Sequence, residues 1–221
     1  ASGDQIKATN IVYAGDPETC YKELLSEQGM VSLYHSKMSY SMGLYVLYFG
    51  TKKKYNNIAH HTIWMGEKYK SLLDDIFNKK ILNDDFSLYL HRPTATDKSF
   101  APDNCDSFYV LCPVPNLQGG HDWNKEGRLL SENIIEALEK TILPELSEVI
   151  ESVFWMTPND FKQDYRSMHG AGFSIEPTLT QSAWFRHHNR HRNIKNLYFA
   201  GAGTHPGAGL PGVVSSAKVV E

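Results

Sequence analysis

The residues best suited to do chemistry lie near the end of the sequence, in residues 201–212, a run of twelve with five glycines and two prolines. Such a run does not form a regular element, because glycine costs about 0.5–1 kcal/mol in a helix or strand and proline removes an N–H donor. Glycine also has no Cβ, so its backbone can approach a flat or phosphorylated ligand closely. We therefore expect a loop that lies against an anion or an electron-rich ring.

The segments on either side of this loop favour the same interpretation. Residues 196–200 are apolar and predict a strand, and residues 213–220 are small and predict a helix. A helix that begins near Pro211 points its free N–H groups and the positive end of its dipole at the loop. The alternative is a tight connection between strand and helix that binds nothing.

Two common nucleotide-binding motifs are absent from the loop. No Lys-Ser or Lys-Thr pair follows the glycines, so the loop is not a P-loop. A dinucleotide fingerprint has a strand running directly into G-x-G-x-x-G and an acidic residue about 20 positions further on, and this combination is missing too.

Composition and charge narrow the classes of function. The 221 residues include 22 basic and 25 acidic side chains, and a net charge of -3 gives no global field for holding nucleic acid. Three cysteines, Cys20, Cys105 and Cys112, are too few for a disulfide scaffold and lack C-x-x-C spacing, so we expect a reducing compartment. The sequence does not begin with Met and its last helical residues have no cap, which is typical of a piece of a longer protein.

The histidines allow several interpretations. Residues 186–192, Arg-His-His-Asn-Arg-His-Arg, form the densest positive stretch. His187, His188 and His191 have no carboxylate partners nearby in the sequence, so a solvated loop is favoured over a metal site, and attraction to anionic lipid is a third possibility. We expect a structural role for His60 and His61 and no metal ligands.

The rest of the sequence predicts strands interleaved with at least three helices, an α+β or α/β arrangement. Expected strands are residues 6–14, 39–49, 60–65, 86–91, 107–112 and 153–156. Expected helices are one that follows Asp16-Pro17 and those of residues 67–80, 123–142 and 157–165. Pro113 should stop the strand before it, and Thr157-Pro158 should begin the last of these helices.

The loop and its flanks also resemble a known family. Residues 197–214, Leu-Tyr-Phe-Ala-Gly-Ala-Gly-Thr-His-Pro-Gly-Ala-Gly-Leu-Pro-Gly-Val-Val, closely resemble the C-terminal flavin signature of bacterial and fungal phytoene desaturases. Residues 86–91, 109–115 and 176–186 are similar to that family as well, and the resemblance extends from about Asn10 to the end.

The resemblance implies a fold and a set of cofactor contacts. The fold is an α+β, amine-oxidase-like part of an FAD-binding protein, with α/β pieces of the FAD domain at residues 1–30 and 186–221 and a mixed-sheet and helix substrate domain at residues 31–185. The strand near Ile6 should share a sheet with the strand before the loop. Contacts with FAD are implied for ten residues of the signature: Gly201, Ala202, Gly203, Thr204, His205, Gly209, Pro211, Gly212, Val213 and Val214.

The resemblance also implies an activity. The family removes two hydrogens from one C–C bond of phytoene, a C40 hydrocarbon, toward lycopene, with hydride passing to the flavin and a proton leaving the adjacent carbon. Such a substrate comes from a bilayer, so we expect a cytoplasmic enzyme associated peripherally with a membrane surface. Because the signature covers only one edge of the flavin, the chain alone is expected to be inactive and to bind FAD weakly. No catalytic base is assigned, and a carotenoid isomerase, a retinol-saturase-like flavoprotein or a non-catalytic lipid-surface module remain alternatives.

Aromatic residues are frequent in the expected strands and have two interpretations. They line a channel for a polyene, since pockets favour aromatic linings, or they pack as ordinary core. The residues concerned are Tyr40, Tyr45, Tyr48, Phe49, Tyr89, Phe108 and Tyr109.

Overall fold

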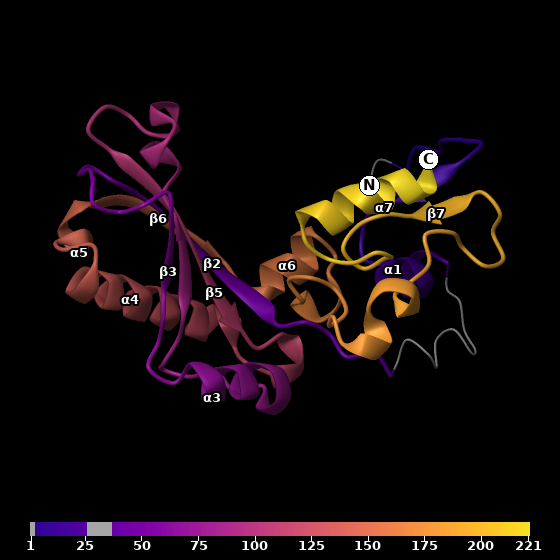
Figure 1. Cartoon of the computed structure of the whole chain (residues 1–221), viewed down its shortest axis with the longest axis horizontal. Helices are drawn as coiled ribbons and strands as arrows, with labels where there is room; N and C mark the ends of the chain where they lie inside the picture. Colours follow the sequence, from indigo (N-terminus) through magenta and orange to yellow (C-terminus); the bar gives the residue numbers. More distant parts are fainter. Residues whose placement is uncertain (1–2, 26–36) are drawn as a thin grey trace. The chain divides into compact units, whose positions relative to one another are not determined.

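The computed structural model describes residues 3–25 and 37–221, which form two compact units (Figure 1). The first unit contains Ala1–Ser41 and Lys162–Glu221, and the second contains Met42–Phe161. The second unit is thus shorter than the substrate region predicted at residues 31–185. Segments at both ends of that region belong to the first unit because they pair with each other: Ser41 N–H donates to Ser174 O at 2.9 Å, and Glu176 N–H donates to Ser39 O at 2.9 Å.

The second unit is built on a five-stranded sheet in which every neighbouring pair of strands is antiparallel. The strand order is β3-β4-β5-β2-β6, with the bounds β2 Gly43–Thr51, β3 His61–Trp64, β4 Leu88–His91, β5 Asp106–Val114 and β6 Ile150–Met156. The mixed sheet that we expected is therefore not found here, because the parallel pairing occurs in a separate sheet of the first unit.

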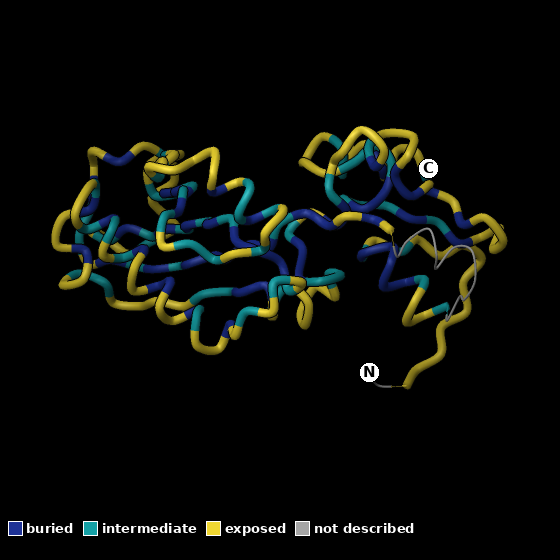
Figure 2. Tube along the Cα trace, turned by 90° about the horizontal axis from the view of Figure 1, so that it is seen from below, coloured by how far each residue is buried: buried dark blue, intermediate teal, exposed yellow. Residues whose placement is uncertain are grey.

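One face of this sheet packs against the long helix α4, Trp123–Thr141 (Figure 1). Leu130, Ile134 and Leu138 follow one another at four-residue intervals along α4 and are all buried, as predicted for its apolar side. They belong to the same cluster as Leu47 and Leu90 of the sheet, and Figure 2 shows buried residues recurring along the strands. The core of this unit therefore lies between α4 and the sheet.

The second unit also contains shorter helices, the last of which continues past the end of the unit at Phe161. α3, Tyr69–Asp74, continues into a π-helical turn, Asp75–Lys79, and α5, Leu146–Val149, precedes β6. The helix predicted at residues 157–165 is α6, Pro158–Asp164, and both the N–H and the hydroxyl of Thr157 donate to Asp160 Oδ2, at 2.6 and 2.7 Å. This confirms its predicted start. Short 3₁₀ turns occupy Pro93–Ala95, Lys98–Phe100 and Leu117–Gly119.

The prediction that Pro113 ends its strand is wrong. β5 continues through Pro113 to Val114, and Pro113 lies opposite Leu44 of β2. On the other side, the pairing of β5 with β4 has already ended at Leu111. Proline is tolerated there because no β4 residue pairs with it.

The first unit is organised by two short parallel strands, β1 (Ile11–Tyr13) and β7 (Leu197–Phe199). Ile11 pairs with Leu197 and Tyr13 with Phe199, which confirms that the N-terminal strand and the strand before the loop share a sheet. α1, Pro17–Thr19, and a π-helical turn, Cys20–Leu24, follow β1, and α7, Leu210–Val220, follows the loop. The unit also has 3₁₀ turns at Met168–Gly170, Leu179–Gln181 and Ala183–Phe185.

None of the helices in the described part of the chain combines the length and the hydropathy needed to cross a bilayer.

Candidate functional site

The glycine-rich loop joins the buried end of β7 to α7 and is tied back onto that helix. Gly201 N–H donates to the hydroxyl of Ser216 at 2.8 Å, and this hydroxyl donates to Val213 O at 2.6 Å. Ser216 is fully buried. A buried serine therefore fixes the start of the loop against the first turns of α7.

The backbone of the loop adopts conformations that favour glycine at three exposed or partly exposed positions, one of which is Gly207, with φ 140°. Gly201 has φ 120° and Gly209 has φ 92°, a region that side chains with a Cβ rarely adopt. A Cβ at Gly209 would meet no protein atom within 4 Å. Gly209 also stands at the start of α7, where no side chain caps the free N–H groups. This end of the loop has both the space and the donors to receive a ligand.

Gly203 serves a different purpose from the one expected of a ligand-facing glycine. A Cβ there would lie 2.5 Å from Pro17 Cδ and 2.8 Å from Ser174 Oγ. Gly203 is needed because the protein's own residues pack against it.

The ten residues of the signature divide by their exposure. Gly203 and Thr204 are buried, and Thr204 donates its hydroxyl to Gly201 O at 2.9 Å, so both build the loop. The partly exposed residues are Gly201, Ala202, His205, Gly212 and Val213, and the exposed ones are Gly209, Pro211 and Val214. The surface open to a ligand is thus concentrated at the start of α7.

The positive stretch that precedes the loop is not the solvated loop that its composition favoured. Arg186, His187, Asn189 and His191 are buried, whereas His188, Arg190 and Arg192 are exposed. The two buried histidines pack beside the ring of Tyr21, with ring centroids at 6.1 and 5.5 Å. Alternate residues therefore turn inward because this segment pairs with both β7 and the loop, through Arg190 with Tyr198 and His187 with Thr204.

Two of the buried residues hold the loop in shape, and sequence reasoning did not identify either as part of the site. Asn189 donates its amide to Phe199 O at 3.1 Å and to His205 O at 2.8 Å. Arg186 donates to four carbonyl oxygens, those of Ala202 (2.9 Å), Gln181 (3.0 Å), Phe173 (3.3 Å) and Ile175 (2.8 Å). Sequence reasoning had no signal for this role, because the four carbonyls converge only in the folded chain.

Arg186 brings a buried positive charge to the loop through its hydrogen bond to Ala202 O. Burial lowers the pKa of this guanidinium, and the carboxylate of Asp16 acts in the opposite direction. Burial in turn raises the pKa of Asp16, which accepts hydrogen bonds from the N–H groups of Glu18 (3.1 Å) and Met168 (3.3 Å). Asp16 caps α1, so the helix after β1 and the loop after β7 are connected electrostatically as well as by the strand pair.

We expect Arg186→Met to destabilise the chain strongly. The change leaves several buried carbonyls without donors, each at a cost of about 1–3 kcal/mol, so the free energy of unfolding should fall by about 3–5 kcal/mol. Urea unfolding followed by circular dichroism measures this loss. Arg190→Met, at an exposed position four residues away, is the matched control. Equal stability of the two variants would contradict the role of Arg186.

The aromatic residues that we considered for a polyene channel separate onto different surfaces. Tyr45, Phe49 and Phe108 are buried in the core of the second unit, and Tyr40 lies in a small cluster of the first unit. Tyr48, Tyr89 and Tyr109 are only half-buried and do not belong to that core. Successive side chains of a strand point to opposite faces of the sheet, so Tyr48 lies on the face opposite to that of its core neighbours Leu47 and Phe49.

Tyr48 lies on the face of the sheet opposite the core. On this face, aromatic rings form a row across all five strands, which we call the aromatic row. In strand order, its members are His61, His91, Tyr109, Tyr48 and Phe154, each directly opposite the next. Tyr48 stacks on Phe154 with ring centroids 4.6 Å apart and meets Tyr109 edge-on at 5.4 Å. Burial raises the pKa of Tyr109 to about 12, so its phenol is neutral at physiological pH. The row is therefore an uncharged, largely apolar surface at its Tyr109–Phe154 end.

A cavity of about 430 Å³ opens at that end of the row. Tyr48 and Phe154 line it together with Phe100 and Pro102, and Glu151 adds an acidic group. A volume of this size accommodates part of a long hydrocarbon or a small ligand.

Comparison with known proteins places the sequence in a family. Residues 92–220 match the model of the flavin containing amine oxidoreductases. The chain is 48% identical over 202 residues to a phytoene desaturase (lycopene-forming) of Pantoea ananas, covering 90% of this chain and 41% of that protein. It is 49% identical over 209 residues to the corresponding protein of Pseudescherichia vulneris (92% and 42%) and 42% identical over 226 residues to a neurosporene-forming phytoene desaturase of Rhodobacter capsulatus (99% and 43%).

The solved structures that resemble the chain support the same fold. An oxidoreductase from Methanosarcina mazei superposes with a TM-score of 0.57 at 12% identity, covering 97% of this chain and 43% of that one. Cyclohexylamine oxidase from Brevibacterium oxydans gives a TM-score of 0.51 at 12% identity, with 100% and 45% covered. The amine-oxidase-like α+β fold is thus confirmed.

The chain spans less than half of the length of the curated relatives it matches. The resemblance of the signature to carotenoid desaturases is confirmed by relatives that match nearly the whole sequence. The chain belongs to the flavin containing amine oxidoreductase family, and it is similar over 90% or more of its length to that family's phytoene desaturases.

Proposed function

We propose that the protein to which this chain belongs is an FAD-dependent carotenoid desaturase that converts phytoene toward lycopene. The observation that carries the proposal is the 42–49% identity with phytoene desaturases over at least 90% of the chain. Among these relatives, some are described as lycopene-forming and others as neurosporene-forming. We infer the dehydrogenation of phytoene as the shared reaction, with lycopene as the expected end product.

The loop residues fit a flavin. The open space beside Gly209 admits a flat ring, and the uncapped N–H groups at the start of α7 suit the negative charge that a reduced flavin carries. When bound, FAD supplies the hydride acceptor for the reaction. Gly209, Pro211 and Gly212 would lie against the ring, while Gly203 and Thr204 would hold the loop in shape. We propose all ten signature residues as the part of the FAD site that this chain contributes.

The aromatic row and the cavity beside it offer a surface for the substrate. A C40 polyene has no hydrogen-bonding groups, so it is held by apolar contact and ring stacking. We assign this contact to Tyr109, Tyr48 and Phe154, whose rings form the uncharged part of the row. The second unit, residues 42–161, then supplies substrate contacts and the first unit supplies flavin contacts, which keeps the predicted division of roles with shifted boundaries.

We further propose a cytoplasmic protein that attaches peripherally to a membrane surface. The hydrocarbon substrate dissolves in the bilayer, and Arg190, Arg192 and Lys195 are exposed near the end of the positive stretch. Basic residues near anionic lipid contribute about 1 kcal/mol each to attraction.

Product analysis of the full-length protein tests the proposal. The purified protein should show the visible spectrum of bound flavin, and incubation with phytoene in liposomes should yield products with more conjugated double bonds, separated by chromatography. An isomerised polyene with no gain in conjugation would instead identify a carotenoid isomerase. A saturated product would indicate a retinol-saturase-like reaction, and a flavin-free protein that only binds liposomes would be a lipid-surface module.

A further inference from the structure

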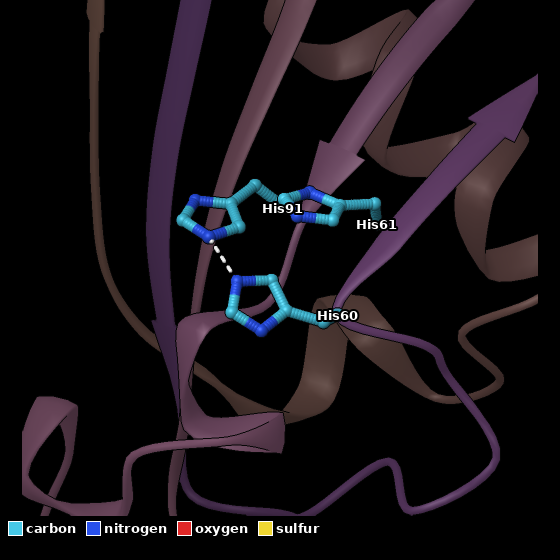
Figure 3. A group of neighbouring side chains, drawn as sticks. All are labelled: His60, His61 and His91. Atoms are coloured by element: carbon cyan, nitrogen blue, oxygen red, sulfur yellow. Dashed lines mark hydrogen bonds between the residues drawn. The ribbon is translucent and has the colours of Figure 1, made fainter.

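Three histidines converge at one edge of the sheet in the second unit, away from the cavity end of the aromatic row (Figure 3). His61 of β3 and His91 of β4 are direct partners in the antiparallel pair, so their side chains share a face. His60 precedes β3, and its carbonyl accepts a hydrogen bond from Arg92 N–H at 2.9 Å. This bond holds the backbone of His60 beside the end of β4. Strand register therefore brings together residues about thirty positions apart.

The ring nitrogens of the three histidines lie close enough to share an ion. His60 Nε2 and His91 Nε2 are 2.7 Å apart, and one nitrogen from each ring lies within 4.8 Å of the others. In a tetrahedral site with metal–nitrogen bonds of about 2.0–2.1 Å, ligand nitrogens stand about 3.3 Å apart. To bind an ion, the Nε2 atoms of His60 and His91 have to move slightly apart, and the ring of His61 has to turn toward the other two rings. His61 is exposed, so this turn requires no repacking of the core.

In His60 and His61, Nδ1 already has a hydroxyl partner. The other ring nitrogen, Nε2, is therefore the candidate ligand atom in both residues. His60 Nδ1 lies 2.7 Å from the hydroxyl of Thr96, which in turn donates to Pro93 O at 3.3 Å. When the hydroxyl proton is donated to Pro93 O, the hydroxyl accepts the Nδ1–H of His60, and the lone pair of this ring is then on Nε2. His61 Nδ1 lies 2.7 Å from the hydroxyl of Tyr89. Partners of this kind orient metal-binding histidines and fix their tautomers.

The chemistry of the donor set selects the kind of ion. All three candidate ligands are imidazoles, which suit Zn²⁺, Cu²⁺ and Ni²⁺, whereas Mg²⁺ and Ca²⁺ need oxygen ligands. β3 is the edge strand of the sheet, so a fourth position remains accessible to water.

We propose that His60, His61 and His91 bind one transition-metal ion of the class that prefers imidazole, with water in the fourth position. The ion links the edge strand β3 to β4 and lies in the second unit. This inference is independent of the proposed desaturase activity. The competing interpretation is a metal-free stack, in which one imidazole N–H simply donates to its neighbour, as the 2.7 Å distance between His60 and His91 allows.

Zinc titration of the full-length protein, produced without a polyhistidine tag and stripped by a chelator, distinguishes the two interpretations. Competition with a chromophoric chelator should show one saturable Zn²⁺ site, whose affinity falls at least about tenfold in His91→Ala and in His61→Ala. Tyr89→Phe keeps the ring but removes the hydroxyl beside His61, and should weaken binding by up to about tenfold. His188→Ala, an exposed histidine of the first unit, is the matched control and should keep full affinity.

Thermal unfolding provides a second readout that does not depend on the chelator. Zn²⁺ should raise the unfolding temperature of the unaltered protein and of His188→Ala but not that of His91→Ala. The flavin content of each variant reports whether it has folded. The proposal is overturned if the unaltered protein shows no saturable site, or if His91→Ala and His188→Ala bind Zn²⁺ equally well.

Discussion

The 221-residue chain, produced alone, should bind FAD several powers of ten more weakly than the full-length protein. It lacks a strand that runs directly into a G-x-G-x-x-G turn with an acidic residue further on, the motif that holds the pyrophosphate of a dinucleotide. Residues 207–212 repeat the glycine spacing, but β7 already ends at Phe199 and a loop intervenes. Each missing charge-assisted contact is worth about 1.5–3 kcal/mol, and 1.4 kcal/mol corresponds to a tenfold change in affinity.

Titration of the folded chain with FAD, followed by flavin fluorescence, measures this affinity. Circular dichroism verifies that the chain is folded, and the full-length protein freed of its flavin serves as the reference. Submicromolar saturable binding by the chain alone, or conversion of phytoene by it, would show that the flavin site is built elsewhere than we propose.

Gly209→Val in the full-length protein should abolish flavin retention. The valine side chain would occupy the open space beside the start of α7, and its β-branch is incompatible with φ 92°. We expect the affinity for FAD to fall at least about tenfold, which a loss of 1.4 kcal/mol produces, and to fall less in Gly209→Ala. The ratio of flavin to protein absorbance after gel filtration measures the loss.

Gly120→Val is a matched control for this experiment. Gly120 also has a positive φ, 71°, and no atom within 4 Å of its ideal Cβ, but it belongs to the second unit and is not part of the glycine-rich loop. Its replacement imposes similar backbone strain without filling the proposed flavin space. Soluble Gly209→Val with stoichiometric flavin would count against the assignment, as would equal losses in the two variants.

Local signals in the sequence were sufficient to locate most elements. The Thr157-Pro158 start of α6 was predictable because the cap, the proline and Asp160 are adjacent in the chain. The apolar spacing of α4 was predictable because Leu130, Ile134 and Leu138 repeat every four residues. The strand at residues 107–112 was predictable, but its continuation through Pro113 was not, because a proline is tolerated there only where β4 no longer pairs, which is a property of the sheet and not of the segment.

The candidate sites were predictable only in part, for the same reason. The composition of the glycine-rich loop was sufficient to predict it, but glycine is needed at position 203 because Pro17, far away in the sequence, packs against it. The composition of residues 186–192 favoured a solvated loop, yet Arg186 is buried, and carbonyls that lie 5 to 16 residues away in the sequence accept its hydrogen bonds. His60 and His61 stand near no third histidine until strand register places His91 beside them.

The parallel pairing of β1 with β7 sets the order in which this chain can fold during synthesis. Ile11 emerges from the ribosome long before its partner Leu197, whereas β6, the last strand of the second unit, ends at Met156. Domains generally fold as units while translation proceeds, and pairings between distant residues form late because closing long loops costs entropy. The antiparallel sheet is therefore complete while β1 is still unpaired. The first unit closes last, when the segment that leads into the glycine-rich loop has been made.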